Sequence, residues 1–167
     1  MSRSDGCHTR GMNRFSATTD TEAVVAAGRE AIWAVLTDPE VLPRLTPLLH
    51  RIDTDGDLWR WELSSIRVLA TSVAPSFTEQ MKLDPPRRID FTHAPPPGRR
   101  ERAGAEGWYL LEEVTGGTRL RISLTLSVDL PLARAARPAV ERVMSSVMAR
   151  TGERFSANLL RHLGLRA

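Results

Sequence analysis

Residues 119–129 read Arg-Leu-Arg-Ile-Ser-Leu-Thr-Leu-Ser-Val-Asp, the most regular alternation in the chain. Large apolar side chains occupy every second position from Leu120 to Val128, and polar side chains occupy the positions between them. Because successive side chains of a strand point to opposite faces of its sheet, this pattern predicts a strand with one buried and one solvated face. Such a strand is typical of an antiparallel sheet. A turn over residues 115–118 joins it to another predicted strand, over residues 106–114.

The chain after this strand is predicted to form one long helix. Pro138 suits its first turn, and the helical pattern continues to about Leu163. A helix of about 26 residues would be about 39 Å long, so we expect it to lie across the sheet. Its polar face is interrupted by Leu160. The apolar face predicted from a spacing of 100° per residue consists of Val140, Met144, Val147, Met148, Phe155 and Leu159.

The chain before residue 106 is predicted to add more strands and two short helices. Residues 94–107 contain three prolines and three glycines and are predicted to form a long surface loop, with the basic stretch 99–102 solvated. No linker or repeat divides the chain, so we expect a single domain over residues 13–167 after a disordered tail, residues 1–12. Strands are predicted over residues 13–27, 48–53, 58–63, 66–83 (with a break at Pro75) and 88–93, and the helices over residues 30–36 and from Pro39.

Composition and motifs exclude several classes of function. A chain of 167 residues with 41% hydrophobic and 26% charged residues suits one globular domain. The net charge of +3 is too small to indicate a nucleic-acid partner. Cys7 is the only cysteine, and the four histidines lack paired spacing, so no disulfide, metal or cofactor is predicted. The longest apolar run, residues 31–36, cannot span a bilayer, and the N-terminus has no apolar signal segment. We therefore expect a cytoplasmic protein with no integral membrane association.

Residues 24–39 carry a resemblance to a known superfamily. They read Val-Val-Ala-Ala-Gly-Arg-Glu-Ala-Ile-Trp-Ala-Val-Leu-Thr-Asp-Pro. This run, the turn at residues 84–89 and the Gly-Gly-Thr at residues 116–118 resemble the START-like (SRPBCC) superfamily, which includes polyketide cyclases, aromatases and lipid-transfer domains. The resemblance covers about residues 13–163. It implies an α+β helix-grip fold, in which a curved antiparallel sheet of about seven strands, two short helices after the first strand and a long C-terminal helix enclose a cavity.

Polar residues in phase with apolar neighbours are the candidates to line that cavity. Glu79 shares its strand face with Phe77, and His93 shares its face with Phe91. With Tyr109, these two residues are the candidate acid and base groups. The alternative is that alternation fails near strand ends, and that each aromatic side chain simply packs in the core. The predicted ligand-binding residues are Trp61, Phe77, Glu79, Phe91, His93, Met144, Met148, Thr151 and Phe155.

Three functions remain open. The favoured one is binding of a hydrophobic or aromatic small molecule, such as a lipid, isoprenoid or polyketide-like compound, in an apolar cavity. The second is an enzyme of the cyclase or aromatase type that uses Glu79, His93 and Tyr109. The third is a regulatory or interaction module that uses a sheet edge or the arginine-bearing helix. A monomer and a homodimer both fit the sequence.

Overall fold

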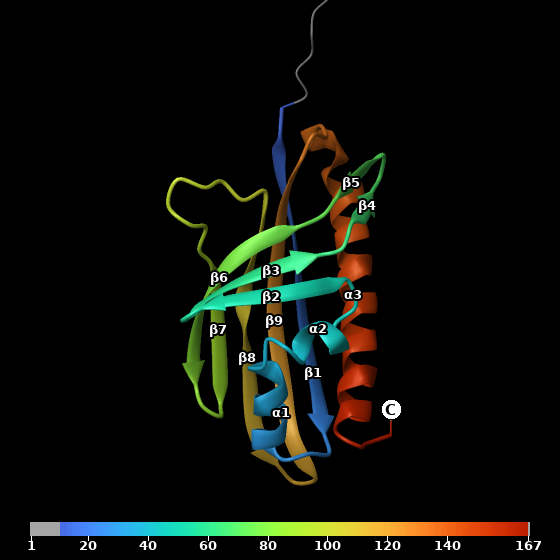
Figure 1. Cartoon of the computed structure of the whole chain (residues 1–167). Coiled ribbons are helices and arrows are strands. Elements are labelled where there is room, and N and C mark those ends of the chain that lie inside the picture. The colour runs from blue at the N-terminus through green and yellow to red at the C-terminus, as the bar shows by residue number, and fades with distance from the viewer. Residues whose placement is uncertain (1–10, 167) are drawn as a thin grey trace, which may run out of the picture.

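The computed structural model describes residues 11–166, and its centre is a curved antiparallel sheet of seven strands (Figure 1). The strand order is β1-β9-β8-β7-β6-β3-β2, and β4 and β5 form a separate hairpin. Residues 1–10 of the predicted tail lie outside the described residues. The strands are β1 (Asn13–Val25), β2 (Leu49–Asp55), β3 (Leu58–Leu63), β4 (Ile66–Val68), β5 (Thr71–Val73), β6 (Ser76–Asp84), β7 (Arg88–His93), β8 (Ala103–Val114) and β9 (Gly117–Leu130). The helices are α1 (Arg29–Leu36), α2 (Leu42–Leu45), the short 3-10 helix η1 (Arg134–Ala136) and α3 (Arg137–His162).

Strand β9, which contains the alternating stretch, lies between β1 and β8 in the sheet. It pairs along its length with β1 on one side and β8 on the other, with Phe15 opposite Val128 and Leu111 opposite Leu120. These four side chains are buried. The polar positions of β9 point to the other face, where Arg121 reaches Glu112 at 2.8 Å. The alternation therefore separates a core face from a charged face, as the sequence predicts.

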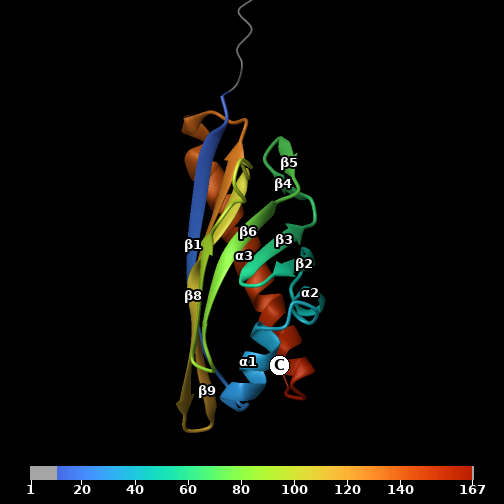
Figure 2. The same cartoon turned by 60° about the vertical axis from the view of Figure 1, so that its left-hand side comes forward.

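Helix α3 packs on the concave face of the sheet. Figure 2 shows β6, β3 and β2 curving away from the layer of β1, β8 and β9, with α3 held in the bend. Val140, Met144, Met148 and Leu159 are its buried side chains. Near its C-terminus, the Asn158 amide donates a hydrogen bond of 2.8 Å to the Leu45 carbonyl oxygen of α2. This arrangement confirms the predicted α+β helix-grip architecture.

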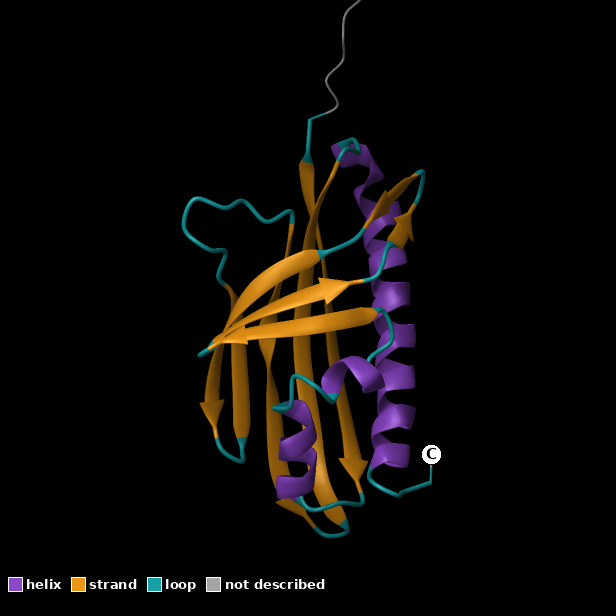
Figure 3. Ribbon diagram, viewed as in Figure 1, coloured by secondary structure: helices purple, strands orange, loops and turns teal. Residues whose placement is uncertain are grey.

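The region predicted as one strand over residues 66–83 is divided in the structure. Residues 66–73 fold into the β4–β5 hairpin, which stands beside α3 (Figure 3), and β6 begins at Ser76. The hairpin turns at Leu69, which has a positive φ of 54°. The turn contains no glycine, proline, asparagine or aspartate, so no turn residue in the sequence revealed it.

Two other predicted boundaries are also wrong. The second short helix begins at Leu42 and not at Pro39, because the Asp38 carboxylate accepts hydrogen bonds from the backbone N–H groups of Glu40 and Val41 and holds a turn there. The surface loop ends before Ala103, where β8 begins, because the backbone of residues 103–107 pairs with β9. Across residues 11–166, no helix is both long and apolar enough to cross a membrane.

Candidate functional site

An apolar cleft lies between the β4–β5 hairpin, the sheet and the N-terminal half of α3. Its free volume is about 70 Å³, and it opens to the surface. The hairpin forms one wall, β9 forms the floor, and two turns of α3 form the opposite wall. The side chains that define these walls are Val68 and Val73 of the hairpin, Phe77, Leu126 and Val128 of the sheet, and Val143, Met144, Val147 and Met148 of α3.

Three of the predicted ligand-binding residues line this cleft: Phe77, Met144 and Met148. Phe77 belongs to a small buried cluster with Ala103 and Ala105 of β8. The two methionines are one turn apart on α3 and are both buried. Because methionine is unbranched and polarisable, its side chain can adapt to differently shaped apolar neighbours.

A second interior region, beyond the cleft, surrounds Glu79 on β6. In the sheet register Glu79 lies opposite Trp59, and Trp61 lies opposite Phe77, so all four side chains share the concave face. Glu79 is only 3% exposed. The Trp59 and Trp61 ring centroids are 6.2 Å apart. Glu79 is therefore a carboxyl group among aromatic side chains, withdrawn from water.

Burial dominates the electrostatics of Glu79. It raises the pKa of the carboxyl from its ordinary 4.5 to about 8, because a carboxylate loses its hydration in this apolar setting. The Trp61 indole N–H approaches the carboxyl and opposes part of this rise in pKa. The geometry nevertheless falls short of a hydrogen bond, and Trp61 Nε1 is buried with no partner in the described part of the chain. At neutral pH, Glu79 is therefore mostly a neutral carboxylic acid.

Tyr109 of β8 faces the same region. Its ring centroid lies 5.3 Å from that of Phe91. Burial and the charge that Glu79 carries when ionised both raise the pKa of the Tyr109 hydroxyl, so it stays protonated at neutral pH. Gly107 makes this packing possible, because a methyl group there would stand 2.9 Å from the Phe91 ring and overlap the Ser123 carbonyl.

The interior surface stays accessible between the cleft and Tyr109. Leu126 lines the cleft, and Leu124 and Ile122 follow it along the same face of β9. Both are only partly buried although they pack against the core, and so are Trp61 and Tyr109. A run of partly accessible, inward-facing side chains thus leads from the cleft to the aromatic region around Glu79.

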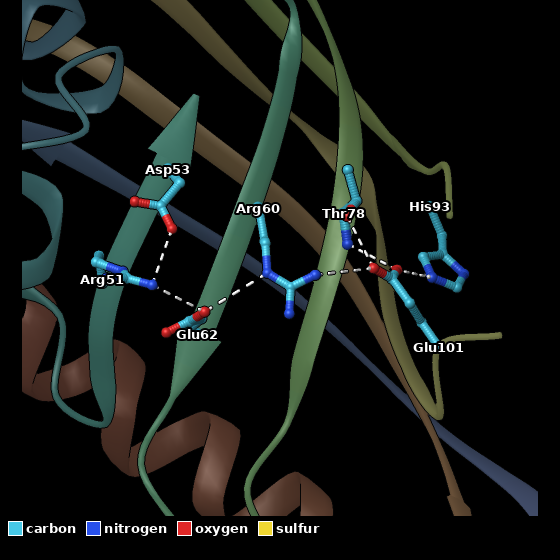
Figure 4. Close-up of polar contacts among 7 residues, drawn as sticks. All are labelled: Arg51, Asp53, Arg60, Glu62, Thr78, His93 and Glu101. Carbon is cyan, nitrogen blue, oxygen red and sulfur yellow. Dashed lines mark hydrogen bonds and ion pairs between the residues drawn. The ribbon is translucent and has the colours of Figure 1, made fainter. Parts of the chain in front are cut away.

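The side chain of His93 is turned away from Glu79, although the two residues lie opposite each other in the pairing of β6 with β7. Its Nε2 is 2.9 Å from Glu101 Oε2 (Figure 4), and its ring covers Gly104, where a Cβ would come within 2.5 Å of Nδ1. Glu101 also accepts 2.8 Å hydrogen bonds from the backbone N–H and the hydroxyl of Thr78, and Arg60 lies 3.9 Å away. His93 is the last residue of β7 and lies opposite Glu79 of β6. The pairing of β7 with β8 ends at Phe91, and the His93 ring turns to Glu101 instead of following the face of Phe91.

The group around His93 belongs to a polar network on the convex face of the sheet. Arg51 bridges Asp53 and Glu62, and Glu62 in turn contacts Arg60 at 3.5 Å (Figure 4). Glu101, in the loop predicted to be solvated, has a side chain only 7% exposed. No pattern in the sequence indicated this, because its partners Thr78, His93 and Arg60 come from three strands and are brought together only by folding.

The two remaining candidates, Thr151 and Phe155, lie farther along α3 than the cleft. Phe155 is partly buried against the larger core cluster, which also contains Trp59 and Phe91. Thr151 is half-buried. No group of three or more potential metal ligands occurs within residues 11–166.

Comparisons with known proteins agree with this architecture. A Thermus thermophilus protein, TTHA0849, superposes with a TM-score of 0.64 at 16% identity, covering 87% of this chain and 98% of that one. The Zhui aromatase/cyclase of Streptomyces sp. R1128 gives 0.61 at 15% identity, covering 88% and 93%. The di-domain aromatase/cyclase StfQ of the steffimycin biosynthetic pathway gives 0.59 at 11% identity, covering 87% of this chain and 49% of that one. Because the sequence identities are this low, these superpositions show a shared fold and nothing more.

The comparison by sequence identifies the family as well as the fold. No curated protein sequence matches this chain. The family described as polyketide cyclase/dehydrase and lipid transport matches residues 16–160, from β1 almost to the end of α3. The chain therefore belongs to this family, within the START-like superfamily predicted from its sequence.

Proposed function

We propose that the protein binds a hydrophobic or aromatic small molecule in the apolar cleft. The observation that carries this proposal is the lining of the cleft, where carbon side chains of the hairpin, the sheet and α3 converge on one free volume. Concave, mostly apolar sites of this kind are the usual places for small ligands. The family, which includes lipid transport proteins, adds support.

The size of the cleft limits how such a ligand enters. Its 70 Å³ of free volume is about half of the roughly 150 Å³ cavity that holds benzene in a well-studied case. A ring system can therefore enter only if side chains move. Met144 and Met148 are suited to this, because a methionine changes rotamer at small cost. The ligand would also extend along the partly accessible surface of Leu124 and Ile122.

A fluorescent probe tests this proposal. N-phenyl-1-naphthylamine is uncharged and brightens in apolar surroundings, so its emission reports occupancy of the cleft. Val147→Trp would fill the cleft, whereas Ser146→Trp adds the same ring on the exposed face of α3. We expect Val147→Trp to weaken probe binding at least tenfold and Ser146→Trp to leave it unchanged. Equal binding by both variants and the wild type would reject the cleft as the site.

A cyclase-type enzyme is the second candidate function, favoured by the neutral acid at Glu79 beside the Tyr109 hydroxyl. A buried carboxylic acid with a pKa of about 8 can both donate and accept a proton near neutral pH. The test is cyclisation of a thioester-linked poly-β-ketone by the wild type, Glu79→Gln and Tyr109→Phe. We expect both variants to lose at least tenfold in rate. Unchanged rates would leave ligand binding as the function.

A further inference from the structure

We infer that residues 18–24 of β1, at an open edge of the sheet, bind an extended basic segment of a partner protein as an additional antiparallel strand. The partner is defined by its chemistry, a strand with Lys or Arg at alternate positions. We call residues 18–24 the open edge. It lies outside the apolar cleft, so this inference does not depend on the proposed function.

The backbone groups of β1 point alternately toward β9 and away from the sheet. Only β9 pairs with β1, and the register is continuous from Asn13 to Val25. The N–H and C=O groups of one residue in an antiparallel strand point to the same side. The Val25 carbonyl oxygen faces β9, because a Cβ on Gly117 would overlap it. The Arg14 carbonyl oxygen faces the other way, toward Arg137 of α3. Even-numbered residues of β1 therefore direct their backbone groups away from the sheet.

Helix α3 covers the first half of this strand edge and leaves the second half open. Arg137 donates a 3.2 Å hydrogen bond to the Arg14 carbonyl oxygen, and Phe15 packs in one cluster with Val140 of α3. Figure 2 shows α3 beside β1 at the upper end of the sheet and farther from it toward the lower end. Thr18 and residues 20–24 are exposed. Unpaired backbone groups on an exposed strand are a template for pairing with another chain.

The charges of the open edge disfavour a second copy of this chain as the partner. Two copies paired about a two-fold axis at Thr21 would place Asp20 opposite Glu22 twice, and an axis at Asp20 would place two aspartates opposite each other. Like charges directly opposite in a sheet are destabilising. An axis at Thr18 or Thr19 avoids these pairs, but it extends the pairing into the half of β1 that α3 covers. Self-pairing of the open edge is therefore unfavourable.

A basic strand fits the same edge. Asp20 lies opposite Ser123 of β9, which brings no positive charge. Glu22 contacts Arg119 of β9 at 3.4 Å, and its side chain is 56% exposed, so a second cation can approach from the open side. Basic side chains two residues apart in an added strand would lie opposite these two acids. Val24, exposed on the same face, would receive an apolar side chain. The expected partner sequence, antiparallel to β1, is apolar-x-basic-x-basic.

The opposite edge of the sheet, β2, is less suitable and provides a control. Its register against β3 is irregular between Leu49 and Arg51. The Asp53 carboxylate already lies 3.1 Å from the Arg51 guanidinium. Acidic residues are thus present at both edges, but only β1 combines them with a regular, uncovered strand.

Fluorescence anisotropy of a labelled peptide tests the inference on the whole protein. The probe is an octapeptide of sequence Gly-Val-Thr-Lys-Thr-Arg-Thr-Gly with blocked ends. One control has Glu in place of Lys and Arg, and another carries N-methyl groups on the backbone nitrogens of Lys and Arg. We expect each control to bind about tenfold more weakly, because one reverses the charges and the other removes two backbone hydrogen bonds. Equal binding of the N-methylated peptide would reject strand pairing, and no binding of the basic peptide would reject the inference.

Paired substitutions locate the binding edge. Asp20→Asn with Glu22→Gln keeps the side-chain sizes and removes both charges, so affinity for the basic peptide should fall about fivefold. Asp53→Asn with Asp55→Asn removes the same charge from β2 and should leave the affinity unchanged. Equal losses in the two variants would mean that the peptide responds only to net charge, and the open edge would be rejected.

Amide hydrogen exchange measured by NMR reports the pairing itself. The outward N–H groups of Thr18, Asp20 and Glu22 should exchange fast in the free protein and about tenfold more slowly with the basic peptide bound. The N–H groups of Thr19 and Thr21 face β9 and should exchange slowly throughout. Unchanged exchange at the outward groups would reject the open edge. If these groups are already protected in the free protein, and sedimentation shows a dimer, the partner is a second copy and the inference is wrong.

Discussion

Glu79 and Glu101 are withdrawn from water to a similar degree, yet their surroundings on the two faces of the sheet are opposite in polarity. Glu101, on the convex side, accepts hydrogen bonds from Thr78 and contacts His93 and Arg60. Glu79, on the concave side, faces aromatic rings and has no comparable partner. The first carboxyl joins a loop to the sheet. The second carboxyl has no such hydrogen-bond partner in the described part of the chain.

The comparison separates buried polar groups that stabilise the fold from those that are candidates for binding a ligand. A buried charge surrounded by donors stabilises the native state through those contacts, whereas a buried acid without them lowers stability and is kept neutral. A buried polar group that lacks hydrogen-bond partners is thus a better indicator of a ligand site than a buried polar group that has them. Four experiments sharpen or break this contrast, and we take them in order of expected size.

Glu79 should make the protein less stable as the pH rises. Its carboxyl releases its proton at about pH 4.5 in the unfolded chain and at about pH 8 in the native one. Between these values the native state binds more protons, so the free energy of unfolding falls by up to about 1.4 kcal/mol per pH unit. The penalty is absent below pH 4.5 and complete above pH 8, where it reaches on the order of 5 kcal/mol.

Urea denaturation of the wild type and Glu79→Gln across pH 4–9 measures this difference. Other carboxyl groups titrate in both proteins, so only the difference between the two curves reports on Glu79. We expect the variant to gain stability relative to the wild type as the pH rises. Parallel curves would mean that Glu79 is ionised or hydrated in the native protein, and the contrast with Glu101 would disappear.

Removal of the Glu101 carboxylate should have the next largest effect. Glu101→Ala leaves the Thr78 N–H and hydroxyl and the His93 ring without their partner. We expect a loss of about 3 kcal/mol in the free energy of unfolding, since buried donors then pay their desolvation cost. Urea denaturation at pH 7 measures it. A loss below about 1 kcal/mol would show that water replaces the carboxylate, and that Glu101 stabilises the native state no more than an exposed acidic residue does.

Gly104 provides a smaller test of the same network. A Cβ at this position would lie 2.5 Å from His93 Nδ1, so Gly104→Ala should displace the imidazole from Glu101 and cost about 1–2 kcal/mol. In a His93→Ala background the obstruction is gone, and the same substitution should cost less than about 0.5 kcal/mol. A double-mutant cycle in urea measures the coupling. Additive effects would place the strain in the backbone and not in the contact with His93.

Glu62 should have the smallest effect, although it takes part in the same convex network. Its carboxylate contacts Arg51 and Arg60 at the surface, where water and salt screen such pairs. We expect Glu62→Gln to cost less than about 1 kcal/mol, and this cost to shrink in 0.5 M NaCl. A salt-independent loss as large as that of Glu101→Ala would show that the whole network acts as one buried unit.

Local patterns in the sequence were sufficient for the fold and for part of the site. Alternation in β9 and the spacing of apolar residues in α3 depend on neighbours a few positions apart, and both elements form as predicted. Glu79 lies in the middle of β6, where pairing on both sides holds the strand, and it is buried with Phe77 and Met81. His93 lies opposite Glu79 but ends β7, and its ring turns to Glu101 on the convex face, which alternation did not predict.

What could not be predicted depends on contacts between distant segments. Glu101 is surrounded by arginines in the sequence and resembles a solvated loop residue, yet it is buried against Thr78. The β4–β5 hairpin was not predicted because its turn at Leu69 contains no residue that favours turns. It nevertheless forms a wall of the cleft. Elements of this kind acquire their roles only when the sheet and α3 have come together.

The pairing of β1 with β9 constrains the order in which the molecule can be made. Asn13 lies opposite Leu130, so β1 leaves the ribosome long before the strand that pairs with it. The segment from β2 to β8, which contains Glu79 and its aromatic neighbours, can pair locally in the meantime. Helix α3 emerges after β9, so the cleft is the last part of the fold to be completed. During synthesis, the apolar face of β1 must remain exposed while all the strands between it and β9 are being translated.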